Sequence, residues 1–481
     1  MSSISLDIPF YKERITTRPS HILIVLVIVG TIIRFYGLTY SGLWLDEIFS
    51  MIGSDPNTTV GDVYEYSIHD QPPLFFILLQ GWLKVFGYTD FAGRALTCLY
   101  GVMGIVGMYF LGKEMKDEKL GLFASFITTI NWFHTDISKE IRFYPLVFLL
   151  TTLSFLFFLR SIKKSGFADF ILYAFFTALL VNTHYYGMVV FVTQLLIFVL
   201  ILIFFKKTLR LIIGGLLAGS LAGLSLWHWL PVIMSDLQID KFHVNPVTFF
   251  FPFSFAWDYI KDPVAFIVYS ACALFAVFAL YNTIKSKKFA YEHLIVLCWI
   301  SFSYMIPLLY SWIKIPLLTY KYSTIAVPAI FLAIAFGFTH LKTERIRAYC
   351  IILIVISGFI MLFIARPPYK PRRGEDWREV AAYFDQKTSS TEVIFSQLSW
   401  YHIYYFKKIN HALPYNQNNC DFEAIVGGTD RLWLLMNDRY TGGWPISGFL
   451  PDQKSVIDRE FEVIDSIKFK QTTAFLFTRK K

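Results

Sequence analysis

Two adjacent acidic residues, Asp46 and Glu47, lie within an otherwise apolar segment, GLWLDEIFS. Such a segment is typical of a short helix in the membrane interface, where an unpaired ionisable side chain is costly. Because neighbouring residues on a helix point about 100° apart, the two carboxylates cannot act on one substrate atom. We therefore expect one carboxylate to do chemistry and the other to be structural. The alternative is that both cap the helix or pair with Arg34, near the end of the first apolar segment.

Basic, histidine and tyrosine side chains follow other apolar segments, in HTDISKEIRFYPL, NTHYYG and LLTYKYSTIAVP. The candidate site residues there are Arg142, Tyr144, His184, Lys321 and Tyr322. For a single His or Tyr the alternative role is anchoring at the membrane interface, where aromatic residues are common. For Arg142 and Lys321 the alternative is that a long side chain simply reaches the interface from a helix end.

This combination of residue types suits the transfer of a sugar from a lipid-linked phosphate. Arginine and lysine bind phosphate oxygens, and one general base can take the proton from an acceptor hydroxyl. A sugar linked through a phosphodiester has a good leaving group, so no second acid is needed to protonate the departing oxygen. The sequence contains no HExxH, Walker A or GxSxG motif, which would indicate a different chemistry.

The composition places these residues in a membrane protein. Of the 481 residues, 55% are hydrophobic and 16% are charged, whereas soluble proteins are about a quarter charged. Eleven apolar segments approach the roughly 20 residues that cross a bilayer. They cover residues 21–39, 91–112, 119–134, 145–160, 167–183, 187–205, 211–230, 264–284, 290–311, 323–340 and 347–365. The predicted fold class is therefore a polytopic α-helical membrane protein with about eleven transmembrane helices.

Lysine and arginine residues cluster in every second loop. With the N-terminus in the cytoplasm, eighteen of them lie in cytoplasmic loops and eight in outside loops, as the positive-inside rule requires. We therefore predict a multi-pass protein of the cytoplasmic membrane whose candidate site residues lie at the outer face. The formal net charge of +9 follows from this orientation, so no nucleic-acid partner is needed to explain it.

The segment from about Arg366 onward has a different character. An amphipathic helix is predicted to begin near Glu375, and the runs TEVIFSQ, RLWLLM, FEVIDSIKF and TTAFLFT are typical of strands. We predict two domains. The first is a membrane domain over residues 1–365, in which the outer loop 40–90 carries interfacial helices. The second is a small extracytoplasmic α/β domain over residues 366–481.

Several motifs resemble, in order, those of the membrane-embedded GT-C glycosyltransferases of the protein O-mannosyltransferase and aminoarabinose lipid A transferase group, glycosyltransferase family 39 and its relatives. They are GLWLDE, HDQPPLFFILLQGWLKVFG leading into FAGRALTCLYGV, SKEIRFYPL, NTHYYG, a late KY pair, and EDWREVAAYF. The resemblance covers the membrane region strongly and the tail loosely. It implies a GT-C type fold for the membrane domain.

The resemblance also implies an activity and roles for single residues. Enzymes of this group transfer a sugar, with inversion, from a polyprenyl-phosphate carrier to a protein, lipid or glycan acceptor. Asp46 matches the catalytic base, with Glu47 as its structural neighbour, and Lys321 with Tyr322 matches a pair that faces the donor phosphate. The residues expected to bind donor or acceptor are Glu47, His69, Arg142, Tyr144, His184, Lys321 and Tyr322.

Two positions depart from the pattern of the group. Gln71-Pro72 replaces the Lys-Pro of the aminoarabinose transferases, which argues against aminoarabinose transfer to lipid A. The late pair begins with Lys321 in place of arginine. This substitution keeps the positive charge but weakens any bidentate contact with phosphate.

No obligatory cofactor is expected. Asp46, Glu47, Asp70 and Asp136 could hold Mg²⁺ or Mn²⁺ through oxygen ligands, but no spacing specifies such a site. The alternative function is a flippase or transporter for a lipid-linked sugar. Such proteins place ionisable groups near the bilayer midplane and often contain internal repeats, and neither pattern is found here. A third alternative is a non-enzymatic scaffold whose tail binds a partner.

Overall fold

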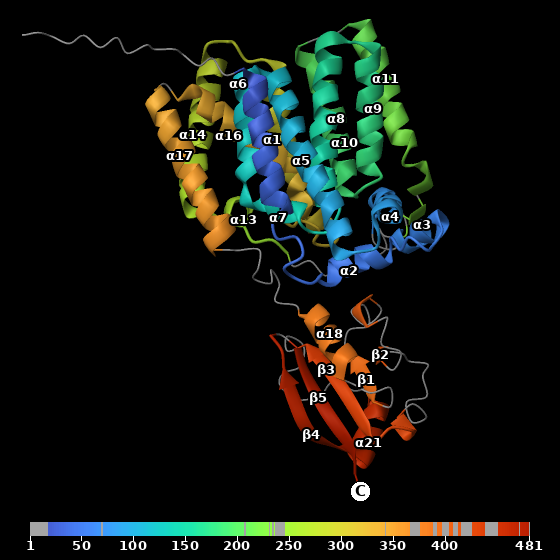
Figure 1. Ribbon diagram of the computed structural model, residues 1–481. Helices are drawn as coiled ribbons and strands as arrows, with labels where there is room; N and C mark the ends of the chain where they lie inside the picture. The colour runs from blue at the N-terminus through green and yellow to red at the C-terminus, as the bar shows by residue number, and fades with distance from the viewer. Residues whose placement is uncertain are drawn as a thin grey trace, which may run out of the picture.

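The computed structural model describes residues 18–68, 71–205, 208–229, 231–232, 235, 246–341, 343–365, 376–387, 392–396, 404–406, 412–414, 426–437, 451–470 and 472–480. Its first part is a bundle of helices, and its second part is a small sheet with a helix on each face (Figure 1).

The bundle is built from long apolar helices. Among the described residues, eight helical segments are long and apolar enough to cross a membrane, judged by length and composition. They are α5 (Asp90–Met115), α8 (Tyr144–Lys164), α10 (Tyr186–Phe204), α11 (Leu209–Leu224) with η1 (Trp227–Trp229), α14 (Pro263–Lys285), α15 (Tyr291–Ile313), η2 (Tyr322–Ala326) with α16 (Val327–His340), and α17 (Glu344–Phe359) with η3 (Ile360–Ala365). This confirms the predicted polytopic helical fold.

Three of the predicted spans are shorter in the structure. They are α1 (Pro19–Phe35), α6 (Glu118–Ile130) and α9 (Phe167–Val181), which run alongside the long helices (Figure 1). The predicted span 119–134 is interrupted at Asn131, which leaves the helical conformation. Its side chain accepts a hydrogen bond from the N–H of His134 and so caps a new helix, α7 (Trp132–Ser138).

The most buried long helices are α5, α8 and α16, the last with a window that is 72% buried. In α5 and α8, 72% and 83% of the apolar window is buried, against 22% for the segment containing α11 and 11% for that containing α17. Close packing of α5 on α6 requires glycine, because a Cβ on Gly112 would lie 2.7 Å from the Cα of Gly121. Small residues of this kind allow helix backbones to approach within a membrane. Residues carried by α5 and α8 are therefore held by the most buried part of the bundle.

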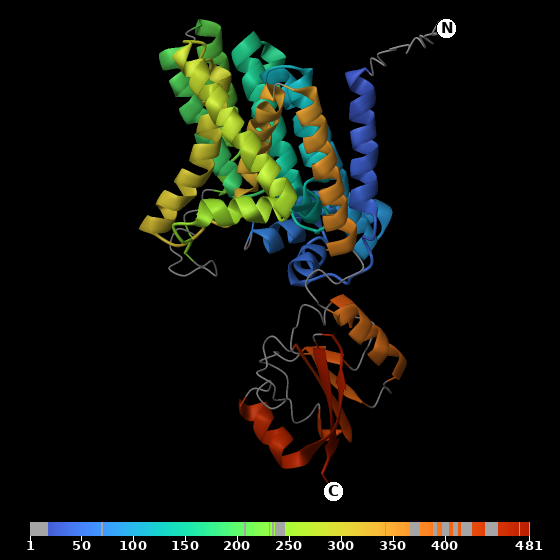
Figure 2. The ribbon, with the colours of Figure 1, turned by 90° about the vertical axis from the view of Figure 1, so that its left-hand side faces the viewer.

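Short helices gather at one end of the bundle, which we call the α2 end. They are α2 (Leu45–Ile52), α3 (Val60–Ser67), α4 (Leu74–Phe86), α7 and α13 (Phe251–Ile260), as the two views show (Figures 1 and 2). The first three lie within the predicted loop 40–90. Its segment LDEIFSMI forms α2, which agrees with the helix expected there from the sequence.

The second part contains a five-stranded mixed sheet. Its strands follow the order β2 (Ala412–Pro414), β1 (Val393–Ser396), β3 (Arg431–Asn437), β5 (Thr472–Arg479) and β4 (Phe461–Lys468). Strand β1 is parallel to both β2 and β3, whereas β5 is antiparallel to both β3 and β4. Each of the four runs predicted as strands matches one of these strands to within three residues at either end.

Alternating side chains of β3 bury both faces of the sheet. Leu432 and Leu434 belong to the apolar cluster that includes Val456 of helix α21 (Pro451–Glu460). Trp433 points to the other face, where its ring centroid lies 5.0 Å from that of Phe384 in helix α18 (Trp377–Lys387). The two helices therefore cover opposite faces of the sheet (Figure 2).

Candidate active site

Glu47 is held in a buried ion pair with Arg94 of α5. The Nε and Nη2 atoms of Arg94 donate to the two carboxylate oxygens of Glu47 at 2.8 and 2.6 Å, and the two side chains are only 6% and 2% exposed. The backbone N–H groups of Ile141 and Trp44 donate to the same carboxylate. A bidentate charge pair of this kind fixes both groups in one geometry. These contacts are those of a structural residue.

The same guanidinium also holds the chain that leads into α2. Its Nη1 atom donates to the carbonyls of Leu38 and Ser41, at 2.5 and 2.9 Å, and Nη2 donates to the carbonyl of Gly42 at 3.0 Å. Arg94 therefore attaches the segment 38–42 and the first turn of α2 to a central helix of the bundle. Because Asp46 directly precedes Glu47, its backbone position is set by this attachment.

Arg34 has other partners. Its guanidinium donates to the carbonyls of Gly30, Thr128 and Thr129, and it lies 2.7 Å from Nδ1 of His134. The side chain is completely buried. Arg34 therefore connects α1 with the α6–α7 corner, and the alternative in which it pairs with Glu47 is not what the structure shows.

Asp46 occupies the first turn of α2 and is half-buried. Arg142, from the segment between α7 and α8, reaches the same helix: its Nη1 atom donates to the backbone carbonyl of Asp46 at 3.4 Å and to Oγ of Ser50 at 3.3 Å. Arg142 is buried. Both charged groups interact electrostatically with the phenol of Tyr144, the first residue of α8. A guanidinium from the α7–α8 segment therefore contacts the helix that carries Asp46, and Tyr144 lies within electrostatic range of both charges.

Lys321 reaches the same tyrosine from the residue preceding η2. Its Nζ atom forms an ion pair with Glu140 at 2.8 Å, and the lysine side chain is 13% exposed. The ammonium also lies 5.3 Å from the ring centroid of Trp44 and 5.4 Å from that of Tyr144, which is within the range of cation–π attraction. Two cations from distant parts of the chain thus lie close to Tyr144.

His184 lies between α9 and α10 and is almost fully buried. Its ring centroid lies 4.5 Å from that of Phe143 and 5.3 Å from that of Tyr322. The Nδ1 atom accepts a hydrogen bond from the N–H of Tyr186 at 3.0 Å, so the neutral ring carries its proton on Nε2. Burial and, to a smaller extent, the nearby charge of Arg142 together lower the pKa of His184 to about 3.

A neutral His184 predicts that this residue does not shape the pH dependence of activity. The ring stays uncharged between about pH 5 and 8, where an ordinary histidine would titrate. We expect wild type and His184→Gln to give pH–rate profiles of the same shape, even if the variant is slower. A wild-type limb with an apparent pKa near 6.5 that disappears in the variant would contradict this expectation.

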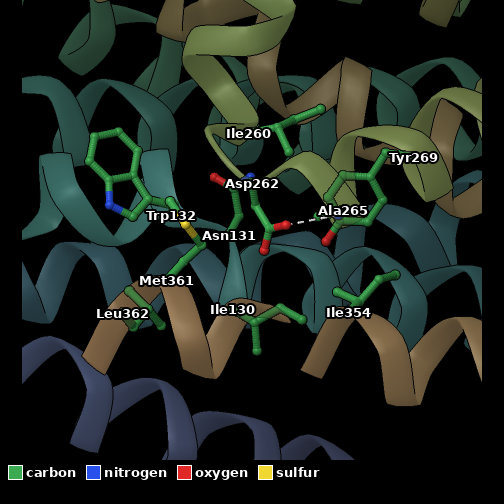
Figure 3. Close-up of a pocket in the computed structure, with 11 residues that line it drawn as sticks. Ile130, Asn131, Trp132, Ile260, Asp262, Ala265, Tyr269, Ile354, Met361 and Leu362 are labelled. Carbon is green, nitrogen blue, oxygen red and sulfur yellow. Dashed lines mark hydrogen bonds between the residues drawn. The ribbon is translucent and has the colours of Figure 1, made fainter. Parts of the chain in front are cut away.

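The described residues contain no group of three or more His, Cys, Asp or Glu side chains arranged to hold a metal. A pocket lies elsewhere, beside the α6–α7 corner, α14 and α17, and Figure 3 shows its lining. Its acid, Asp262, accepts hydrogen bonds from the N–H groups of Val264 and Ala265 and from the hydroxyl of Ser357. The carboxylate thus caps the N-terminus of α14, and the other lining residues are mostly apolar.

Comparisons with known proteins bear on this architecture. The sequence model of the dolichyl-phosphate-mannose-protein mannosyltransferase family matches residues 70–230. The crystal structure of ArnT from Cupriavidus metallidurans in the apo state is similar over 95% of this chain and 98% of that chain, with a TM-score of 0.60 and 10% identity. The chain has the GT-C fold.

A second solved structure with the GT-C fold is similar over an equally large part of the chain. It is the apo oligosaccharyltransferase of Archaeoglobus fulgidus, with a TM-score of 0.57, 10% identity, and coverage of 97% of this chain and 75% of that chain. A search of curated proteins gave no match. The resemblance to GT-C glycosyltransferases inferred from the sequence motifs is therefore confirmed.

On this GT-C fold, the predicted site residues fall into two groups. Those that meet around Tyr144 come from α2, the α7–α8 segment, the α9–α10 turn and the start of η2: they are Asp46, Arg142, His184, Lys321 and Tyr322. Glu47 faces away from them toward Arg94. His69 lies outside the described residues.

Arg94 and Glu140 are not among the site residues predicted from the sequence. The signal for Arg94 was present, because it is a lone cation in the apolar run FAGRALTCLYGV, and a charge in such a run needs a partner. Glu140 had no comparable signal, because SKEIRFYPL also offers Lys139 and Arg142 as local partners. Its ion pair with Lys321 becomes visible only in the folded chain.

Proposed function

We propose that the protein transfers a sugar from a polyprenyl-phosphate carrier to an acceptor hydroxyl, with Asp46 as the general base. The observation that carries this proposal is the convergence of Arg142 and Lys321 with Asp46 around Tyr144. Two cations suit a departing phosphate. A single carboxylate suits removal of the acceptor proton.

The proposed reaction is a direct displacement. The acceptor oxygen forms a bond to the anomeric carbon while the bond from that carbon to the phosphate oxygen breaks, and polyprenyl phosphate leaves with the electron pair. Asp46 takes the acceptor proton, and Arg142 and Lys321 stabilise the negative charge on the leaving phosphate. Because both carboxylate oxygens of Glu47 are paired with Arg94, Glu47 cannot serve as a second catalytic carboxylate. One displacement with one base inverts the anomeric configuration.

The solved structures support the choice of donor. ArnT from Cupriavidus metallidurans has been solved bound to undecaprenyl phosphate, and AglB from Archaeoglobus fulgidus has been solved with an inhibitory peptide and a dolichol-phosphate. A lipid-linked donor fits this precedent; for the acceptor we propose a protein, lipid or glycan. We place the α2 end at the outer face of the cytoplasmic membrane because of the positive-inside distribution, and we propose that no metal is obligatory.

The transfer reaction is tested with purified protein in lipid nanodiscs, radiolabelled polyprenyl-phosphate sugars and a membrane extract as the source of acceptors. The proposal expects release of polyprenyl phosphate in proportion to the labelled acceptor formed. The rival function is a flippase, which is tested in sealed vesicles with the same donors. Movement of intact donor across the bilayer without release of polyprenyl phosphate would contradict the proposal.

Lys321→Ala should weaken donor binding by about tenfold or more, because a charge-assisted contact to phosphate is worth about 1.5–3 kcal/mol. Binding is measured with undecaprenyl phosphate as the probe. Lys321→Arg should keep most of the donor affinity, because arginine retains the positive charge at the position that also pairs with Glu140. The matched control is Lys84→Ala, which removes an exposed cation of α4. Equal affinity in Lys321→Ala and Lys84→Ala would remove Lys321 from the donor site.

A further inference from the structure

The C-terminal domain contacts the chain directly before α2. The hydroxyl of Tyr405 accepts a hydrogen bond from the backbone N–H of Leu43 at 2.6 Å and donates to Oδ2 of Asp90 at 3.3 Å. The neighbouring Tyr404 donates to Oδ1 of Asp90 at 2.9 Å. Two adjacent tyrosines of this domain therefore hold one carboxylate of the membrane bundle, and one of them also holds the segment that leads into α2.

Arg378 of α18 adds an independent contact to the same segment. Its Nη1 atom donates to the carbonyl of Thr39 at 3.0 Å and lies 3.7 Å from Oδ2 of Asp90. A Cβ on Gly42 would lie 3.2 Å from both the Cβ of Arg378 and the hydroxyl of Tyr405. Side chains of the domain thus lie directly against this backbone. Figure 1 shows α18 on the side of the domain that faces α2.

Arg94 holds the same segment from the membrane bundle. Asp90 and Arg94 lie one turn apart on α5, and Arg94 holds the carbonyls of residues 38, 41 and 42 together with Glu47. The segment 38–43 is therefore held from the bundle by Arg94 and from the C-terminal domain by Tyr405 and Arg378. Asp46 follows three residues after this segment.

We propose that the C-terminal domain positions the catalytic helix α2, and that Tyr405 is the positioning residue. The proposal rests on the proposed function in one respect, that Asp46 of α2 is the base. Removal of the Tyr405 hydroxyl leaves the buried N–H of Leu43 without its acceptor, which loosens the entry to α2. Arg142 and Lys321 are carried by other elements and touch α2 only at its backbone, Ser50 and Trp44, so donor affinity should fall less than kcat.

The test compares Tyr405→Phe with Tyr383→Phe in the full-length protein. Tyr383 lies in the same domain, where its ring packs on Phe384 and Phe469, and its hydroxyl has no hydrogen bond within the described part of the chain. Hydrogen–deuterium exchange of the peptide covering residues 38–47 reports on the contact itself. Transfer kinetics report on its consequence. Arg378→Gln removes the charge of a partly exposed side chain and provides a second variant with little risk to folding.

In Tyr405→Phe we expect exchange of this peptide to be about fivefold faster, which corresponds to the loss of one hydrogen bond. We expect kcat to fall about tenfold, because a displaced base lowers the rate, and the affinity for undecaprenyl phosphate to fall by a smaller factor. Arg378→Gln should change the same quantities in the same direction, and Tyr383→Phe should change none of them.

Two results would overturn the positioning role. One is unchanged exchange of residues 38–47 in Tyr405→Phe. The other is faster exchange with an unchanged kcat. Failure of the proposed function has a different signature: wild type transfers no sugar, while Tyr405→Phe still accelerates exchange of the peptide. In that case the docking contact stands and only the catalytic role of α2 is rejected.

Discussion

Asp46→Asn should lower kcat by about 100- to 10,000-fold, the usual contribution of a general base. The substitution keeps the size of the side chain and removes its ability to take a proton. Helix α2 should keep its position, because the Glu47–Arg94 pair and the carbonyl contacts of Arg94 do not involve the Asp46 side chain. Donor affinity should therefore stay close to that of wild type.

The measurement is single-turnover transfer at saturating donor, with binding of undecaprenyl phosphate measured in parallel. Asp62→Asn is the matched control, because Asp62 also lies in the first turn of a short helix at the α2 end, and it is exposed. This control should transfer sugar at nearly the wild-type rate. Near-normal turnover by Asp46→Asn would reject Asp46 as the base.

Arg94→Met should destabilise the protein by about 3–5 kcal/mol, the usual cost of leaving one partner of a buried ion pair unpaired. It leaves the carboxylate of Glu47 buried without its cation, and it removes the donor to three backbone carbonyls before α2. Activity should fall with stability, because the same contacts hold the helix that carries Asp46.

The measurement is the thermal unfolding midpoint in detergent. Lys113→Met is the matched control, because it breaks an ion pair with Glu118 whose side chains are 47% and 45% exposed, and exposed pairs contribute little. Glu47→Gln combined with Arg94→Met should recover part of the lost stability by removing the buried charge. An unfolding midpoint for Arg94→Met equal to that of Lys113→Met would show that the pair does not hold α2.

Much of the fold follows from local sequence patterns. The apolar segments, the short helix at LDEIFSMI and the strands of the tail each depend on residue types that are close in the chain. The length of a span is less predictable, because Asn131 both ends α6 and caps α7. A single polar residue inside an apolar run can be buried without interrupting a helix, so the sequence alone did not reveal this break.

The site is only partly predictable for a physical reason. Neighbouring carboxylates on a helix must face different ways because of helix geometry alone. The structure shows Glu47 turned toward Arg94. The partners of each charge depend on tertiary contacts. Lys321 and Glu140 lie far apart in the sequence, and the tail residue Tyr405 meets Leu43. No local pattern indicates such pairs.

The anomeric configuration of the transferred sugar distinguishes a single displacement from a double one. With Glu47 paired to Arg94 and Asp46 as the proposed base, the mechanism is a single displacement at the anomeric carbon. Nuclear magnetic resonance of the first-formed product, compared with the polyprenyl-phosphate donor, reads out this configuration. An inverted configuration in the product is the predicted result. A retained configuration would require a second displacement and a covalent intermediate, and would contradict the mechanism.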